Sequence, residues 1–160
     1  MAETVSWQTR EGSLFCLRTR PQPWLDGLVP GLSALQTSRS LRAGHALWMR
    51  LGPDEWWCWT PSDTVGAERV PELAGRDVYA LIDLSDAQQA FEIRGAVHDG
   101  LSQGCELDFE RLPPDFASRT RCAAFSVVIC PQGEACYLWT ETSLARSLGQ
   151  WLDQAGRLTG

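Results

Sequence analysis

Residues 79–109 constrain the fold of this chain more than any other stretch, because they alternate apolar runs with turn residues. The first run is rich in residues that favour strands and ends in DLSD (83–86), whose short polar side chains can bond the main chain and stop a strand. FEIR (91–94) alternates apolar and polar residues, as a half-buried strand does, and Val97 and Leu101 share one face of a short helix. This order of strand, turn, strand, helix and strand predicts a compact α+β domain.

Outside this stretch, the sequence predicts two hairpins and two further helices. Aromatic-rich runs on either side of GPD (52–54) are typical of a β-hairpin, and apolar runs flank PQGE (131–134) in the same way. Apolar residues recur at helical spacing over 65–76 and again over 144–155, whereas the paired prolines of 112–121 predict an irregular segment. We therefore expect an α+β fold with a small antiparallel-rich sheet and about three helices.

The length of 160 residues fits one domain. Residues 1–42 combine scattered apolar residues with prolines, and we expect an N-terminal arm there whose order depends on a partner, with one short strand at 13–18. Residues 43–160 are expected to form a single α+β domain.

The charge of the chain excludes several classes of partner. Its formal net charge is −6 and it contains no Lys, whereas nucleic acids and anionic membranes need clustered basic residues. The absence of Lys also excludes Schiff-base chemistry and a P-loop. No apolar run approaches the length that spans a bilayer. We expect a cytoplasmic protein that binds neither nucleic acid nor membrane.

Six cysteines are spread through the chain without a C-x-x-C pair or a neighbouring pair of histidines. This spacing offers no zinc site. Several of them lie within apolar runs, where cysteine behaves as a small hydrophobe. We expect buried, reduced thiols rather than disulfides, and no metal in this chain.

One set of residues has the types needed for nucleophilic catalysis. His98 and Asp99 could act with Ser85 or Ser102, but the chain lacks a G-x-S-x-G elbow. Such combinations arise often by chance, and an exposed polar helix face explains these residues better. We therefore assign them no catalytic role.

Two pairs of carboxylates have the types needed for acid/base catalysis. They are Asp54 with Glu55 and Asp83 with Asp86, and each pair lies in or beside a predicted turn, where capping a main-chain N–H group explains it. Neither G-x-G-x-x-G nor a Walker pattern occurs. We predict no catalytic or cofactor-binding residue in this chain.

Tryptophan is frequent, with eight in the chain, and indoles concentrate in cores and at the buried centres of protein interfaces. Trp56 and Trp57 are neighbours in a predicted strand and must face opposite sides, so one of them needs a second cover. We expect another polypeptide to supply it; scattered surface aromatics are the alternative. The predicted subunit interface consists of Trp7, Trp24, Trp56, Trp57, Pro113, Pro114, Phe116 and Arg119.

Several motifs resemble the γ subunit family of heterotetrameric sarcosine oxidase. LGPDEWWCW (51–59) is the most specific match, to that family's leucine-glycine-proline-aspartate-glutamate-tryptophan motif. Further segments are similar to the family's other motifs and to its closing helix: IDLSDA (82–87), QGCELDF (103–109), LPPDFASRTRCA (112–123) and SLARSLGQWLDQA (143–155). The resemblance covers residues 46–155, with no match for residues 1–42.

The resemblance implies a reduced relative of the folate-binding aminomethyltransferase fold. It also implies a non-catalytic γ subunit of a flavin-dependent heterotetramer in sarcosine catabolism, which demethylates sarcosine or a related secondary or N-methyl amine and forms methylenetetrahydrofolate. The partners would be the α, β and δ subunits, mainly the folate-binding part of α. FAD, FMN, NAD, tetrahydrofolate and zinc would lie in those subunits, and none in this chain.

Departures from the family pattern leave the amine substrate open. Arg94-Gly95-Ala96 replaces the family's serine-glycine-proline, and Gln103 replaces a lysine. A subunit of a paralogous heterotetrameric amine or amino-acid dehydrogenase is therefore an alternative. A stand-alone folate-binding module and a small hydrolase are two others, and the hydrolase would need a nucleophile and base that the spacing does not show.

Overall fold

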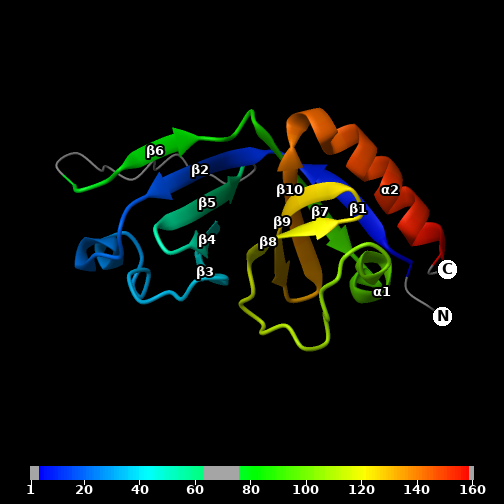
Figure 1. The fold of residues 1–160 in the computed structure, drawn as a ribbon, viewed down its shortest axis with the longest axis horizontal. Coiled ribbons are helices and arrows are strands. Elements are labelled where there is room, and N and C mark those ends of the chain that lie inside the picture. Colours follow the sequence, from blue (N-terminus) through cyan, green and yellow to red (C-terminus); the bar gives the residue numbers. More distant parts are fainter. Residues whose placement is uncertain (1–3, 63–75, 159–160) are drawn as a thin grey trace. The chain divides into compact units, whose positions relative to one another are not determined.

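The computed structural model describes residues 4–62 and 76–158 (Figure 1). Within them it has ten strands, two α-helices and two short 3-10 helices, at Pro23–Gly27 and Thr142–Leu144. The α-helices are α1 (Val97–Ser102) and α2 (Ala145–Leu158). The strands are β1 (Ser6–Arg10), β2 (Gly12–Arg18), β3 (Arg39–Ala43), β4 (Ala46–Gly52), β5 (Glu55–Pro61), β6 (Ala80–Asp83), β7 (Gln88–Arg94), β8 (Ser118–Cys122), β9 (Phe125–Gln132) and β10 (Ala135–Glu141).

The chain divides into two compact units. One contains residues 1–10 and 87–160, and the other contains residues 11–86. The division expected from the sequence, with an arm at 1–42 and a single domain at 43–160, differs from this one, because residue 42 falls inside β3. Residues of the expected arm supply β1 to the first unit and β2 and β3 to the second.

The first unit is a five-stranded antiparallel sheet in the order β1-β7-β10-β9-β8, and both α-helices pack on one of its faces (Figure 1). Alternation along β7 directs Phe91 and Ile93 towards this core, where they are 1% and 0% exposed. Leu148 and Leu152 of α2 belong to the same core cluster as Phe91 and Ile93. Their i, i+4 spacing places both on the apolar stripe of the helix.

The second unit is a five-stranded antiparallel sheet in the order β3-β4-β5-β2-β6. Trp48 and Trp56 lie on one face with Leu17, and the 3-10 helix Pro23–Gly27 contributes Leu25 to the same cluster. This cluster is a core of its own, built from part of the expected N-terminal arm and from the GPD hairpin.

The predicted hairpins are confirmed, and so is the closing helix. β4 and β5 flank residues 52–54, and β9 and β10 pair across residues 131–134. Helix α2 continues to Leu158 and does not end at Gly156, which is buried close to the main chain of Val5. A side chain at that position would crowd the Val5 carbonyl, so glycine here serves packing rather than termination.

Other expectations are corrected. The fold is α+β and antiparallel, but the described residues form two five-stranded sheets, not one small sheet, and they contain two of the expected α-helices. The helix expected at 65–76 lies outside the described residues, apart from Arg76. Among residues 112–121, the prolines are irregular as expected, but the segment from Ser118 onwards is strand β8. No described helix is long and apolar enough to cross a membrane.

The stretch 79–109 does not stay within one domain. Its first strand, β6, belongs to the second unit and its second strand, β7, to the first. No strand follows α1 within this stretch, where Cys105 makes only an isolated bridge to Cys122. Its local elements are therefore largely as predicted, while their assignment to one domain is wrong.

Candidate functional site

The carboxylates of the GPD hairpin hold two strands together. Asp54 Oδ1 and Oδ2 accept hydrogen bonds from Arg18 Nη2 at 3.1 and 3.2 Å, and Glu55 Oε2 accepts one from Arg18 Nη1 at 3.1 Å. Glu55 Oε1 accepts a further hydrogen bond of 3.0 Å from Trp57 Nε1. The pair considered for acid/base catalysis is thus occupied by a guanidinium and an indole, and it joins β5 to β2.

The DLSD segment is a turn built from short side chains. Asp83 Oδ1 accepts a hydrogen bond from the Ser85 N–H group at 2.9 Å, and hydrogen bonds from Ser85 hold the pKa of Asp83 below its usual value. Ser85 Oγ accepts one from the Leu14 N–H group at 3.0 Å. Ser85 is thus engaged with β2 of the second unit, and this contact accounts for its hydroxyl.

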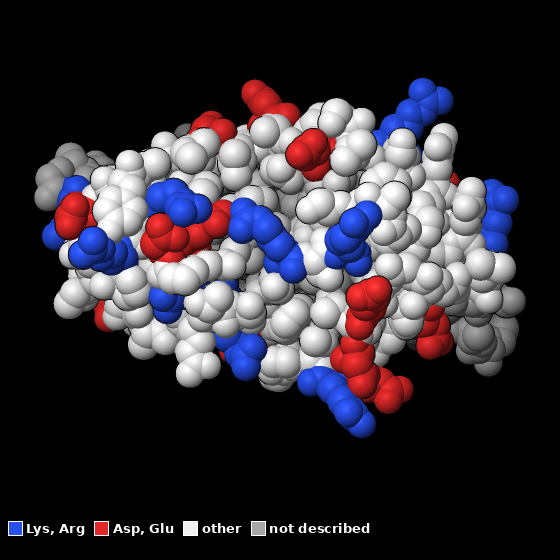
Figure 2. Space-filling view, viewed as in Figure 1, with Lys and Arg blue, Asp and Glu red and all other residues white. Residues whose placement is uncertain are grey.

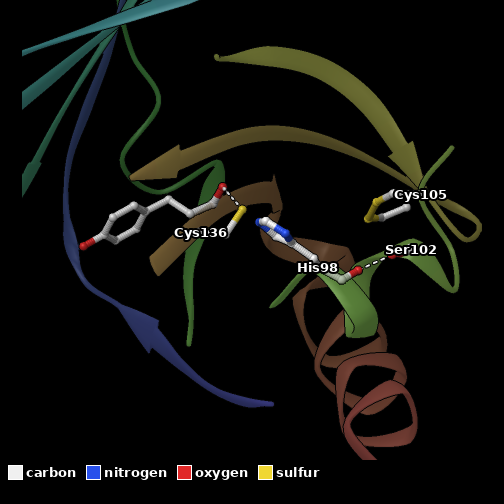
Figure 3. Close-up of a disulfide and its surroundings, with 6 residues drawn as sticks. His98, Ser102, Cys105 and Cys136 are labelled. Atoms are coloured by element: carbon white, nitrogen blue, oxygen red, sulfur yellow. Dashed lines mark hydrogen bonds between the residues drawn. A yellow bond between two sulfur atoms is a disulfide. The ribbon is translucent and has the colours of Figure 1, made fainter. Parts of the chain in front are cut away.

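His98 and Ser102 interact through the main chain. The Ser102 hydroxyl donates a hydrogen bond to the carbonyl of His98, one turn earlier in α1 (Figure 3). The His98 ring stacks on Phe109 instead, with ring centroids 5.6 Å apart and planes inclined by 24°. The imidazole therefore does not receive the serine proton, and the nucleophile set considered from the sequence is not formed.

A pocket of about 320 Å³ lies in the first unit. It is bounded by the loop before α1, the segment at Phe109 and the β9–β10 turn. Its polar side chains are His98, Asp99, Glu110 and Glu134. They leave it with more acidic than basic groups, a lining that would favour a cation over an anion.

The thiol in this pocket is not a nucleophile. Cys136 is 1% exposed and lines this pocket, and its Sγ lies 3.9 Å from the main-chain oxygen of Tyr137 (Figure 3). Burial raises the pKa of Cys136 far above its usual value, with a further contribution from Cys130. Burial likewise raises the pKa of Cys58, on β5, to about 12. Both groups are therefore neutral thiols near pH 7, whereas nucleophilic cysteines need a lowered pKa. No group of three or more metal-binding side chains occurs among residues 4–62 and 76–158.

Two cysteines do not match the sequence-based prediction. Cys105 and Cys122 form a disulfide, with their Cα atoms 4.5 Å apart (Figure 3). They are separated by 17 positions, and the isolated bridge between the segment after α1 and β8 brings them together. The other four cysteines are free thiols, as expected. Because these two cysteines are 17 positions apart in the sequence, their spacing alone does not predict that they pair.

A buried carboxylate that the sequence pattern does not reveal lies on β7. Glu92 is 2% exposed, and its oxygens lie 2.5 Å from Arg10 Nη1 on β1 and 2.5 Å from Arg94 Nε. Burial by itself raises the pKa of Glu92, but the hydrogen bonds from Arg94 and Arg10 outweigh it and the pKa lies below its usual value. Alternation in FEIR indicates which face Glu92 occupies, but it predicts a solvent-facing residue there, so the sequence carried no signal for its burial.

Two of the predicted interface tryptophans are not on the surface. Trp56 is 0% exposed and Trp57 is 4% exposed. They face opposite sides of β5 as predicted, but both sides are buried, so the inference that one of them needs a partner polypeptide is corrected. Most of the tryptophans are buried within this chain and contribute to its own packing.

The other two predicted interface tryptophans are half-buried. The Trp7 indole donates a hydrogen bond of 2.8 Å to Asp153 Oδ1 and packs over Gly149 of α2, where a side chain would clash. Trp24 packs against the core cluster of the second unit, with the Arg76 guanidinium 5.7 Å from its ring. Both indoles have structural roles, and each leaves part of its surface open.

The last predicted interface residues lie around the edge of the first sheet. Pro113, Pro114 and Phe116 belong to the loop before β8, and Arg119 lies on β8, the edge strand. Pro114 and Arg119 are exposed, while Phe116 packs partly against the core. These four residues lie in one short segment of the chain, and together with the open parts of Trp7 and Trp24 they are the part of the predicted interface that offers surface.

Charges on the face seen in Figure 2 are interspersed. Acidic and basic side chains lie next to one another there, and no basic patch of the kind that binds a nucleic-acid backbone gathers on that face (Figure 2). The same face therefore offers local ion pairs but no steering field of one sign.

No protein-family model matches this sequence, and no curated protein matches it. Solved structures do. A chain of the heterotetrameric sarcosine oxidase from Corynebacterium sp. U-96, in complex with pyrrole 2-carboxylate, matches with a TM-score of 0.78 and 16% identity, covering 97% of this chain and 85% of that chain. The glycine cleavage system aminomethyltransferase T from Bartonella henselae matches with a TM-score of 0.69 and 12% identity, covering 94% of this chain and 46% of that chain.

At 16% and 12% identity, the similarity to these two structures establishes the fold of this chain and no more. The resemblance to sarcosine oxidase expected from the motifs is confirmed at that level, and so is the aminomethyltransferase-like fold. This chain spans about half the length of the aminomethyltransferase and most of the length of the oxidase chain.

Proposed function

We propose that this chain is a non-catalytic γ-type subunit of a heterotetrameric, flavin-dependent sarcosine oxidase-like complex. The complex would demethylate sarcosine or a related secondary or N-methyl amine and form methylenetetrahydrofolate. This chain would pack mainly against the folate-binding part of the α subunit, with β and δ subunits completing the assembly. FAD, FMN, NAD, tetrahydrofolate and zinc would be held by those other subunits.

One observation carries this proposal. The chain matches a chain of a heterotetrameric oxidase over 97% of its own length and 85% of the oxidase chain, whereas it covers 46% of the aminomethyltransferase. Because this chain matches most of one oxidase chain, we infer that it corresponds to a whole subunit of such a complex. The motifs LGPDEWW and IDLSDA, which resemble motifs of the γ subunit family, support the same proposal.

The state of the potential catalytic groups supports a structural role. Glu55 is engaged by Arg18 and Trp57, Ser102 bonds a main-chain carbonyl, and the thiol of Cys136 is protonated. Each of these groups has a packing role or the wrong protonation state for catalysis. We therefore place the oxidation and the folate chemistry in the partner subunits.

A stand-alone folate-binding module is the second candidate, and the match to the aminomethyltransferase over 94% of this chain favours it. The two candidates differ in what the chain does alone. A module would bind tetrahydrofolate as an isolated chain, whereas a γ-type subunit would not.

Copurification from the native host tests the proposal. The tagged chain is isolated under mild conditions, and the absorption spectrum and the subunit masses are recorded. We expect flavin absorbance together with three partner chains, and oxidation of sarcosine or another N-methyl amine by the complex. A colourless single chain that binds tetrahydrofolate in calorimetry would overturn the proposal in favour of the folate module.

A further inference from the structure

Both faces of the second sheet end in exposed apolar side chains at its edge strand β6. The register places Trp57, Cys16 and Ile82 in one cross-strand row, and Leu17 and Leu81 in the next. Along these rows exposure rises from 5% at Cys16 to 44% at Ile82, and from 2% at Leu17 to 36% at Leu81. Each row is therefore buried at β2 but exposed at the edge strand β6.

In the described part of the chain, strand β6 is protected as a sheet edge only by its shortness and by the charge of Asp83. Among the described strands it pairs only with β2, so no described strand bonds the main-chain N–H and C=O groups of its other edge. Its sequence, Ala-Leu-Ile-Asp, contains no Lys or Pro, which are the residues that commonly block pairing at an edge. Tyr79, immediately before it, is 54% exposed. These features are those of a strand that accepts a further strand.

The charges around β6 indicate what that strand is. Arg76 lies before the strand, and Asp83 and Asp86 lie at its other end, all three exposed. A second copy that runs antiparallel brings Arg76 of each chain to the acidic end of the other, whereas a parallel copy would bring like charges together. Charges at this edge also have contacts within their own chain: the Arg76 guanidinium lies 5.7 Å from the Trp24 ring, Asp77 accepts a hydrogen bond from Gln22, and Arg20 donates one to the Tyr79 hydroxyl.

We propose that β6 pairs antiparallel with β6 of a second copy of this chain. The two-fold axis then passes through Leu81, which faces Leu81 of the other copy, while Ala80 faces Ile82. One strand from each copy buries a small surface, so we expect a weak dimer that forms in the micromolar range. This inference concerns the chain itself and goes beyond the proposed role in an oxidase complex.

Sedimentation velocity of the full-length chain over about a hundredfold concentration range tests the dimer. Leu81→Thr and Ile82→Thr keep a residue that favours strands but remove apolar surface, and we expect each to weaken dimerisation at least about tenfold. Leu144→Thr is the matched control, because Leu144 is also 36% exposed but lies outside β6. Circular dichroism establishes that each variant is folded.

A charge exchange tests the antiparallel arrangement. Arg76→Glu and Asp86→Arg should each weaken self-association, because each leaves like charges at both contacts. A mixture of the two variants restores both opposite-charge contacts, and we expect it to form a mixed dimer more readily than either variant dimerises alone.

Hydrogen exchange provides a readout without any substitution. We expect the amides of β6 to become protected as the wild-type concentration rises. A chain that stays monomeric throughout the range, or a dimer that Leu81→Thr and Ile82→Thr leave intact, overturns the proposal. Protection of β6 that appears only in an oxidase-like complex also overturns it and assigns the edge to a partner subunit. Failure here leaves the copurification result unaffected, so the two proposals fail separately.

Discussion

The Nη1 atom of Arg18 lies 3.1 Å from Oε2 of Glu55, and this ion pair joins strand β2 to strand β5 across the second sheet. The carboxylate is 9% exposed, and its other oxygen accepts the indole hydrogen of Trp57. The most specific motif of the chain therefore encodes a buried clamp. The Glu55 carboxylate accepts hydrogen bonds from both the Trp57 indole and the Arg18 guanidinium, which the hairpin brings close together.

Removing that carboxylate should destabilise the protein. Glu55→Ala leaves the Trp57 N–H group buried without this acceptor, and we expect a loss of about 2 kcal/mol in the free energy of unfolding. Asp54→Ala is the matched control: its side chain is 37% exposed, and exposed pairs contribute less than about 1 kcal/mol. Urea denaturation of both variants measures the difference. Equal losses would show that the clamp acts only as a surface ion pair.

Stability should depend on pH through Glu92. Its folded pKa lies below the usual value of 4.5, so the unfolded chain binds the proton more tightly, and the stabilisation is present above pH 4.5 and is lost as the pH falls through the folded pKa. We expect Glu92→Gln to be less stable than the wild type at pH 7, and the difference between the two to shrink below pH 4.5.

Unfolding free energies of the two proteins between pH 7 and about pH 3 measure this effect. Glu106→Gln, which removes a carboxylate from an exposed position, is the control. A difference between wild type and Glu92→Gln that stays constant with pH would contradict the assignment.

The disulfide should account for a large share of the stability. Cys105 and Cys122 close a loop of 17 positions, and a loop of about this length contributes roughly 3 kcal/mol. We therefore expect reduction, or the double substitution Cys105→Ala with Cys122→Ala, to lower the melting temperature. Cys58→Ala, which removes a free thiol, is the control for loss of a cysteine.

Thiol titration of the oxidised, denatured protein decides whether the bond forms. Four thiols should react, against six after reduction. Six reactive thiols before reduction would mean that the chain folds without this bond, and a reductant should then leave its melting temperature unchanged.

Arg119 should contribute to the proposed complex. It lies exposed on the edge strand β8, beside the loop that holds Pro114 and Phe116. If this segment contacts the α subunit, Arg119→Glu should weaken the complex about tenfold, because arginine is frequent among the residues that dominate interfaces. Arg146→Glu, on an exposed position of α2, is the control. Equal recovery of partner chains with both variants would place the interface elsewhere.

Features encoded within a few residues could be predicted from the sequence. The hairpin at 52–54, the hairpin at 131–134 and helix α2 follow from turn residues and from apolar spacing. Each depends on hydrogen bonds and side-chain contacts between near neighbours, so its pattern is complete in one short stretch. The motif resemblance to sarcosine oxidase has the same local origin.

Tertiary structure alone decided the candidate site. The assignment of β6 and β7 to different sheets, the pairing of Cys105 with Cys122 and the burial of Glu92 between two arginines all depend on segments distant in the chain. Such contacts follow from which faces are covered, and alternation shows only that two faces exist. For the same reason the sequence could place Trp56 and Trp57 on opposite faces, but only the folded chain shows that both faces are buried.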